Sequence, residues 1–322
     1  MSQQKLLSVV VSVYNEELSL PDFYATTKPI LEACPWDYEL LFVNDGSSDS
    51  SISILHQFAA ENDKVKIVDF SRNFGHEAAM IAGIDHASGD GIICMDADLQ
   101  HPPTSIPEII AKFEEGYDVI SMIRTAREDG GLIKKITSSL FYGVLNLLSP
   151  VKFEKNSSDF FAISRSVAQV LRKDYREKVR YLRGYVQSAG FRKTTLPFEA
   201  KSRIAGESKY NIGKLLRFSI TTLCSFSDMP LKLGVYSGLV AFFGLILMVY
   251  TIVNKVLYHV PSGYSTIIVA MSFMFAIVLM VIGVIGQYIS VLFAEIKNRP
   301  IYIVKECTNL EGHTSGGIDN RR

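Results

Sequence analysis

The pattern of hydrophobic and polar positions changes along this chain of 322 residues. In the first hundred residues, short β-branched runs alternate with amphipathic stretches of helical length, a pattern that predicts strands joined by helices. The predicted strands are Leu6–Val13, Tyr38–Val43, Val65–Phe70 and Gly91–Met95. This order is typical of a parallel sheet covered by crossover helices, so we predict an α/β domain.

A different pattern begins near residue 230. Leu233–Asn254 carries no formal charge and would form a helix of about 33 Å, enough to cross a hydrocarbon core of about 30 Å. A second uncharged stretch, Val256–Ala294, has its apolar part at Ser265–Phe293. Two such stretches with a short connection predict a transmembrane hairpin. Lysines and arginines flank its outer ends, which predicts that both chain ends lie in the cytoplasm.

Two further segments have the amphipathic pattern of helices on a bilayer surface, Leu132–Leu148 and Ile212–Phe226. An ordinary core-facing helix stays open for the first, whereas the second leads directly into a predicted span. The tail from Thr308 is predicted to be disordered. The predicted organisation is a cytoplasmic α/β domain, a juxtamembrane helix, two membrane helices and a cytoplasmic tail, at residues 1–211, 212–229, 230–257, 264–294 and 295–322.

Composition narrows the possible functions. The 33 basic residues balance the 33 acidic ones, so the chain lacks the basic excess of a general nucleic-acid binder. The four cysteines lie far apart without metal-ligand spacing, which favours reduced thiols in a cytosolic domain. The first residues do not have the pattern of a secretory signal peptide, so we expect the N-terminus in the cytoplasm. Arg165–Arg217 is locally basic, which fits either a solvated helical face or a phosphate-handling surface at a membrane.

Polar motifs follow three of the predicted strands, at Tyr14–Glu17, Asn44–Ser47 and Asp96–Asp98. Because the carboxyl ends of parallel strands meet at one edge of the sheet, we expect one shared site. Asp96 and Asp98 are two residues apart at a strand end, so their carboxylates can point to the same side. A divalent cation between them would relieve their repulsion, and Mg²⁺ usually completes such a site with water and substrate phosphates.

Together these motifs resemble a known family. Val9–Glu17, Val43–Asp49, Ser71–His76 and Asp96–Pro103 are similar to the family 2 glycosyltransferases, which have the GT-A (Rossmann-like) α/β fold. The order of the motifs and the C-terminal hairpin look like the polyprenyl-phosphate glycosyltransferases, over the chain as far as Val304. The resemblance therefore implies a GT-A catalytic domain followed by interfacial helices and a two-helix transmembrane hairpin.

The resemblance also implies roles for individual residues. Asp45, Glu16 and Arg72 would bind the nucleotide, while Asp96 and Asp98 would hold Mg²⁺ or Mn²⁺ on its diphosphate. Asp159 matches a position with a catalytic role. The residues expected near the donor and lipid phosphates are Arg183, Arg203, Ser208 and Lys209. The family often has glycine where Ser158 stands, and arginine where Phe161 stands.

The implied reaction is a metal-dependent, inverting transfer of a hexose to undecaprenyl phosphate, with UDP-glucose as the first candidate donor. UDP-GlcNAc and GDP-mannose stay open as donors. A phosphate monoester is already largely anionic at neutral pH, so Asp159 could orient groups as well as remove a proton. The expected partners are the nucleotide sugar, the lipid phosphate, membrane lipids and a second copy of the chain, without nucleic acid. The expected location is the bacterial plasma membrane, as a multi-pass protein that serves cell-surface polysaccharide modification.

Two other classes of protein are possible. A processive polysaccharide synthase of the same fold would need more membrane spans and a Gln-x-x-Arg-Trp motif, which the sequence lacks. A membrane scaffold without activity would not need Asp45, Asp96, Asp98 and Asp159, and all four are present.

Overall fold

The structure is a computed structural model that describes residues 4–125, 157–177, 181–199 and 264–310, together with a few single positions between 246 and 257. The predicted surface helices at Leu132–Leu148 and Ile212–Phe226 lie outside the described residues, as does most of the first predicted membrane span. The described residues up to 199 and from 299 onward belong to one compact unit, and those from 264 to 298 belong to another.

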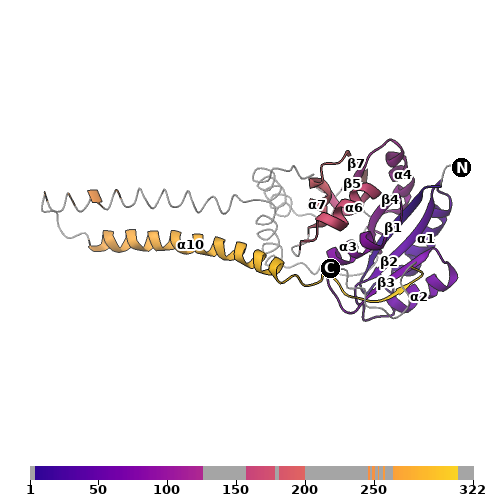
Figure 1. The fold of residues 1–322 in the computed structure, drawn as a ribbon, viewed down its shortest axis with the longest axis horizontal. Helices are drawn as coiled ribbons and strands as arrows, with labels where there is room; N and C mark the ends of the chain where they lie inside the picture. Colours follow the sequence, from indigo (N-terminus) through magenta and orange to yellow (C-terminus); the bar gives the residue numbers. More distant parts are fainter. Residues whose placement is uncertain are drawn as a thin grey trace. The chain divides into compact units, whose positions relative to one another are not determined.

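The described residues of the first unit form an eight-stranded mixed sheet in the order β7-β5-β6-β4-β1-β2-β3-β8 (Figure 1). Its strands are β1 (Leu6–Val13), β2 (Asp37–Asn44), β3 (Val65–Phe70), β4 (Gly91–Asp96), β5 (Val119–Arg124), β6 (Ser157–Ser164), β7 (Lys193–Phe198) and β8 (Val304–Thr308). The helices around them are α1 (Leu20–Glu32), α2 (Ser51–Glu61), α3 (His76–His86), the short η1 (Pro103–Ser105), α4 (Ile106–Glu114), α6 (Arg165–Asp174) and α7 (Leu182–Ser188).

The four predicted strands are confirmed. Strands β1 and β3 have the predicted bounds, β2 is longer by one residue at each end, and β4 is longer by one residue at its carboxyl end. They pair in parallel, β1 with β2 and β4, and β2 with β3. The sheet as a whole is mixed, however, because β6 runs antiparallel to β4 and β5, and β8 runs antiparallel to β3. Strand β1 is apolar and buried along both faces, as expected for the centre of a sheet between two helical layers.

The two faces of the sheet carry different helices. On one face, alternate residues of β1 such as Val9 and Val11 belong to a core that also includes side chains of α1, α2 and α4. On the other face, α3 lies very close to β1. A Cβ at Gly83 would come within 2.1 Å of the Val10 side chain, so only glycine permits this approach. The helix that begins at His76 is therefore fixed firmly against the central strand.

The second unit contains α10 (Tyr264–Ile296). Its segment Phe273–Ile296 has a mean hydropathy of 2.4, and the most apolar part of this segment has no buried residue. By length and composition this helix could cross a membrane, and it corresponds to the second predicted span. Among the described residues it is the one candidate span, so the predicted two-helix hairpin stays a prediction.

The C-terminal segment differs from the sequence-based expectation. Thr308, the first residue of the segment predicted to be disordered, ends strand β8. The next residue, Asn309, donates hydrogen bonds from its side chain to the carbonyls of Ala59 and Val65. The sequence pattern missed this strand because five residues with alternating character give little signal by themselves.

Candidate active site

The predicted functional residues gather at the carboxyl ends of β1, β2 and β4. Ser12 of β1 lies opposite Asp96 of β4, and Val13 of β1 lies opposite Asn44 of β2. The backbone N–H of Asp45 donates to the carbonyl of Val13 at 2.8 Å, which extends the pairing by one residue. Sheet register therefore places the Asp45 motif and the Asp96 motif on either side of β1, as the shared-edge argument predicted.

The carboxylate of Asp96 contacts two polar side chains. Its Oδ1 accepts a hydrogen bond from the Ser12 hydroxyl at 3.1 Å and lies 3.5 Å from His76 Nδ1. The same histidine nitrogen is 2.9 Å from Ser12 Oγ, so the three groups form one cluster. Ser12 comes from β1, and His76 is the first residue of α3.

Asp159 reaches this cluster from β6. Its Oδ2 lies 4.0 Å from His76 Nε2, and its Oδ1 lies 2.8 Å from Arg183 Nε. The imidazole of His76 thus stands between Asp96 and Asp159. Burial favours the neutral form of this histidine, but the two carboxylates outweigh that effect and hold the pKa of His76 above its ordinary value.

Arg183, at the start of α7, was predicted to contact phosphate, and the structure pairs it with Asp159. Its guanidinium also lies 5.6 Å from the centre of the Tyr181 ring. A partly exposed cation beside a carboxylate can exchange that partner for an anionic substrate group. The pairing is therefore compatible with the predicted phosphate contact and adds a second role, that of orienting Asp159.

His101 connects the Asp96 motif to β6 from inside the protein. The backbone N–H of Asp96 donates to His101 Nδ1 at 3.0 Å, so the ring proton is on Nε2 and is donated to Ser158 Oγ, also at 3.0 Å. The ring is 1% exposed and stacks on Phe160. Burial lowers the pKa of His101 even though nearby carboxylates act in the opposite direction, and a neutral ring fits this hydrogen-bond pattern. The interaction also gives Ser158 a local function, at a position where the family often has glycine.

Asp98 lies in the turn after β4, and its Oδ1 accepts from the backbone N–H of Gln100 at 3.1 Å. The charges of Asp96, Asp98 and Asp159 all act on the imidazole of His101, so the three predicted carboxylates share one neighbourhood. Within the described residues there is no cluster of three or more metal-ligating side chains. Carboxylate oxygens suit Mg²⁺ or Mn²⁺, and a site with two of them leaves positions for water and a substrate diphosphate. The residues therefore fit the predicted metal, which Asp96 and Asp98 would hold.

Asp45 has a different environment from these carboxylates. It is 2% exposed, and its two oxygens accept the backbone N–H groups of Phe74 and Gly75 at 2.6 and 2.9 Å. The next residue, Gly46, has φ +63°, and a Cβ there would lie 2.5 Å from the carbonyl carbon of Arg72. Asp45 and Gly46 thus hold the loop of residues 71–75 in place. A direct contact between Asp45 and a nucleotide stays a prediction.

The other two predicted nucleotide-binding residues lie on neighbouring loops. Glu16 accepts from the hydroxyl of Ser19 through Oε2, and its backbone N–H donates to Ser51 Oγ at 2.9 Å. Arg72 is exposed, with its guanidinium carbon 3.9 Å from the centre of the Phe74 ring. Arg203, Ser208 and Lys209 lie outside the described residues.

Besides His101, three side chains of the site had no role predicted from the sequence. Ser12 and His76 contact Asp96, and Glu77 accepts from the backbone N–H of Leu182 at 2.9 Å. Burial, reinforced by the charge of Asp159, raises the pKa of Glu77. Ser12 and His76 lay within family motifs, but no pattern gave them a role, and Glu77 lay outside the motifs. Their contacts join residues about 80 to 105 positions apart, as Ser12 with Asp96 and Glu77 with Leu182.

The chain is similar to known glycosyltransferases along its whole length. Residues 8–172 match the family model "Glycosyl transferase family 2". The chain is 40% identical to the glycosyltransferase YkcC of Bacillus subtilis (strain 168), with 100% of this chain and 98% of the relative covered. It is 37% identical to the SfII prophage-derived bactoprenol glucosyl transferase of Shigella flexneri, with 93% and 97% covered.

A more distant likeness is found among solved structures. Glucosyl-3-phosphoglycerate synthase from Mycobacterium tuberculosis, crystallised with Mn²⁺, UDP-glucose and phosphoglyceric acid, matches with a TM-score of 0.47 and 19% identity. The match covers 69% of this chain and 79% of that one, and it is too distant to indicate ligands for this chain. The family match and the full-length relatives establish that the chain belongs to glycosyl transferase family 2. It is a glycosyltransferase, and its mixed sheet with flanking helices is the GT-A, Rossmann-like fold.

Proposed function

We propose that this glycosyltransferase moves a hexose from a nucleotide sugar to undecaprenyl phosphate at the cytoplasmic face of the bacterial plasma membrane. UDP-glucose is the first candidate donor. The observation that carries the proposal is the cluster of Asp96 and Asp159 around His76, with Arg183 paired to Asp159. The full-length similarity to relatives named bactoprenol glucosyl transferase supports the lipid acceptor.

The donor would lie across the carboxyl ends of β1, β2 and β4. The loop that Asp45 anchors would present Arg72 to the nucleotide, and Asp96 with Asp98 would face its diphosphate. When bound there, Mg²⁺ or Mn²⁺ would neutralise charge that develops on the leaving diphosphate. Ser12 and His101 would keep the Asp96 carboxylate and backbone in place for that contact.

The acceptor chemistry needs little proton transfer. An oxygen of the lipid phosphate attacks the anomeric carbon, and the bond from that carbon to the donor diphosphate breaks. The nucleoside diphosphate leaves with the bonding electron pair, and the attack from the opposite side inverts the configuration. Because the phosphate is largely dianionic at neutral pH, Asp159 would mainly orient the sugar and the Arg183 guanidinium. That guanidinium would offset the repulsion between the incoming phosphate and the donor.

The membrane part of the proposal rests on α10. Its segment Phe273–Ile296 is long and apolar enough to span a bilayer, and its large hydrophobic side chains are exposed, including Phe273, Leu279 and Leu292. A lipid acceptor requires the catalytic unit to stay at the membrane surface, and such a helix would hold it there. Transfer by a multi-pass protein with both termini in the cytoplasm completes the proposal.

The test is a lipid-product assay with the purified full-length protein. Undecaprenyl phosphate would be supplied with Mn²⁺ or Mg²⁺ and, in separate reactions, UDP-glucose, UDP-GlcNAc or GDP-mannose. We expect a lipid-soluble monosaccharide product from one donor, and none from undecaprenol, which lacks the phosphate nucleophile. EDTA should abolish product formation if Asp96 and Asp98 act through a metal.

A matched pair of variants separates a real activity from a contaminating one. Asp96→Asn should lose the product, whereas Asp63→Asn changes an exposed aspartate outside the cluster and should keep it. A growing polymer in place of a single-sugar lipid would support a processive synthase. Donor turnover unaffected by Asp96→Asn would contradict the proposed site.

A further inference from the structure

The chain returns to the catalytic sheet directly after the apolar helix α10. Strand β8 pairs with β3, and the carbonyl of Ile303 accepts from the backbone N–H of Ser71 at 3.0 Å. Lys305 adds an ion pair with Asp69 at 3.2 Å. Residues 297–302 are all that separates the end of α10 from these contacts. The return segment, residues 301–309, is therefore part of the catalytic unit.

Tyr302 is the residue of the return segment with the most specific contacts. Its ring stacks on Phe70, with centroids 5.2 Å apart and planes 11° apart. Its hydroxyl donates to Asp85 Oδ2 at 2.7 Å. Burial, reinforced by the charge of Asp85, raises the pKa of Tyr302, so the hydroxyl stays protonated and remains a donor.

The stacking continues from Tyr302 toward the predicted nucleotide site. Phe70 packs edge-to-face on Phe74 at 5.7 Å, and the guanidinium of Arg72 lies over the Phe74 ring. The backbone N–H of Phe74 is one of the two that bind Asp45. The loop of residues 71–75 is thus held by Asp45 on one side and by the aromatic stack on the other.

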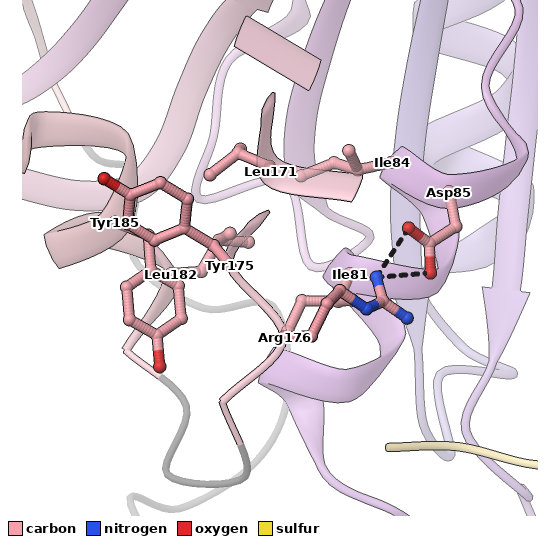
Figure 2. Close-up of a pocket in the computed structure, with 8 residues that line it drawn as sticks. All are labelled: Ile81, Ile84, Asp85, Leu171, Tyr175, Arg176, Leu182 and Tyr185. Atoms are coloured by element: carbon pink, nitrogen blue, oxygen red, sulfur yellow. Dashed lines mark hydrogen bonds and ion pairs between the residues drawn. The ribbon is translucent and has the colours of Figure 1, made fainter. Parts of the chain in front are cut away.

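The hydrogen bond from the Tyr302 hydroxyl to Asp85 connects the return segment to α3. Asp85, near the end of α3, accepts two contacts from Arg176 Nη1 at 2.8 and 2.9 Å (Figure 2). The pair lies at one side of a small cavity with Ile81 and Leu171. Because β3 ends at Phe70 and α3 begins at His76, Tyr302 contacts both the end of the strand before the loop and, at Asp85, the far end of the helix after it.

We infer that Tyr302 is a positioning residue for the nucleotide sugar, acting through Phe70 and Phe74 on the loop that carries Arg72. The inference rests on the proposed function, since it assumes that this loop binds the donor. Tyr302 itself contacts Phe70 and Asp85, both of them supports of the loop and of α3. Part of the donor site would then be built by the segment that follows the membrane helix.

Tyr302 would act by changing the populations of the loop conformations. A loop held on both sides spends most of its time in the conformation that binds. Without the Tyr302 ring, other loop conformations become populated, and the apparent affinity for the nucleotide falls by the fraction that remains competent. An aromatic pair contributes enough for a change of about tenfold in that fraction. The chemical step at saturating donor would be unaffected, because the bound loop has the same structure.

The experiment compares Tyr302→Leu, Tyr302→Phe and Glu306→Gln in the full-length protein. Tyr302→Leu removes the stack, and Tyr302→Phe keeps it and removes the hydroxyl. Glu306→Gln changes an exposed residue of the same return segment. The dissociation constants of UDP and GDP and the donor KM should rise about tenfold for Tyr302→Leu and less than threefold for Tyr302→Phe. The acceptor KM and the kcat at saturating donor should stay within about twofold of wild type.

A second measurement separates positioning from general stability. Amide hydrogen exchange at Phe74 and Gly75 should be faster in Tyr302→Leu than in Glu306→Gln. Tyr302→His keeps a smaller ring over Phe70 and replaces Tyr302→Leu in the same assays if that variant does not fold. A lower melting temperature with an unchanged donor KM would overturn the inference. Wild-type protein that binds neither nucleotide would instead overturn the proposed function, and the inference with it.

Discussion

The two groups of carboxylates at the edge of the sheet are held in different ways. Asp45 is 2% exposed and accepts backbone N–H groups, whereas the side chains of Asp96 and Asp159 are 29% and 32% exposed and contact the side chains of His76 and Arg183. Backbone donors cannot turn away without moving a loop, but side chains can change partners when a ligand arrives. Asp45 therefore shapes the site, whereas the side chains of Asp96 and Asp159 can exchange their partners for a ligand.

The largest loss of activity is expected from Asp96→Asn. An amide is a poor ligand for Mg²⁺ or Mn²⁺, so kcat/KM for the donor should fall about a thousandfold. The melting temperature should change little, because the carboxylate is partly exposed. The measurement is steady-state product formation beside a thermal melt. A large loss of stability with a small loss of activity would show that Asp96, like Asp45, mainly supports the structure.

Asp159→Asn should come next. We expect kcat to fall by about a hundredfold with little change in donor KM, because the group acts on the reacting centre rather than on nucleotide binding. Asp159→Ala tests its role further. An orienting Asp159 predicts that asparagine, which keeps a hydrogen-bonding oxygen near Arg183, is clearly more active than alanine. Equal activity of the two variants would favour a role as a base.

Asp45→Asn should lower the stability of the protein more than its kcat. Its NH₂ group would face one of the two backbone donors, from Phe74 or Gly75, and leave that donor unsatisfied. We expect a loss of about 2 kcal/mol in the free energy of unfolding, with a higher donor KM and a nearly normal kcat. Thermal unfolding in detergent and donor titrations would measure both. An unchanged melting temperature would contradict the structural role of Asp45.

The smallest effect is expected from Ser158→Ala. The change leaves the buried Nε2–H of His101 without the hydroxyl that accepts it, at a cost of about 1 kcal/mol in stability. Activity should fall only a few-fold, since His101 reaches Asp96 through the backbone N–H. A fall as large as that of Asp159→Asn would show that the His101–Ser158 contact controls the neighbouring Asp159 directly.

The sequence allowed much of the fold and part of the site to be predicted. Buried parallel strands such as β1 have continuous apolar runs, and Asp45, Asp96 and Asp98 follow such runs directly. The carboxyl-end rule then places them at one edge without any knowledge of side-chain contacts. These predictions succeed because each depends on residues close together in the chain.

Contacts between distant segments could not be predicted in this way. The antiparallel pairing of β6 with β4 brings Asp159 toward His76, and the pairing of Arg183 with Asp159 depends on it. Hydrophobic periodicity carries no information about strand partners or register. The same reason hides β8, whose place beside β3 is fixed by residues more than 200 positions away.

Strand β8 also has a consequence for solubility. It covers the outer edge of β3, whose N–H and C=O groups would otherwise be open to pairing with another chain. A protein that ends at residue 229, before the predicted membrane spans, would keep every predicted site residue and still expose this edge. We therefore expect such a shortened protein to aggregate, and a version in which residues 299–310 are joined back to the catalytic unit to remain monodisperse. Strand β8 would then keep the catalytic unit soluble in the absence of α10.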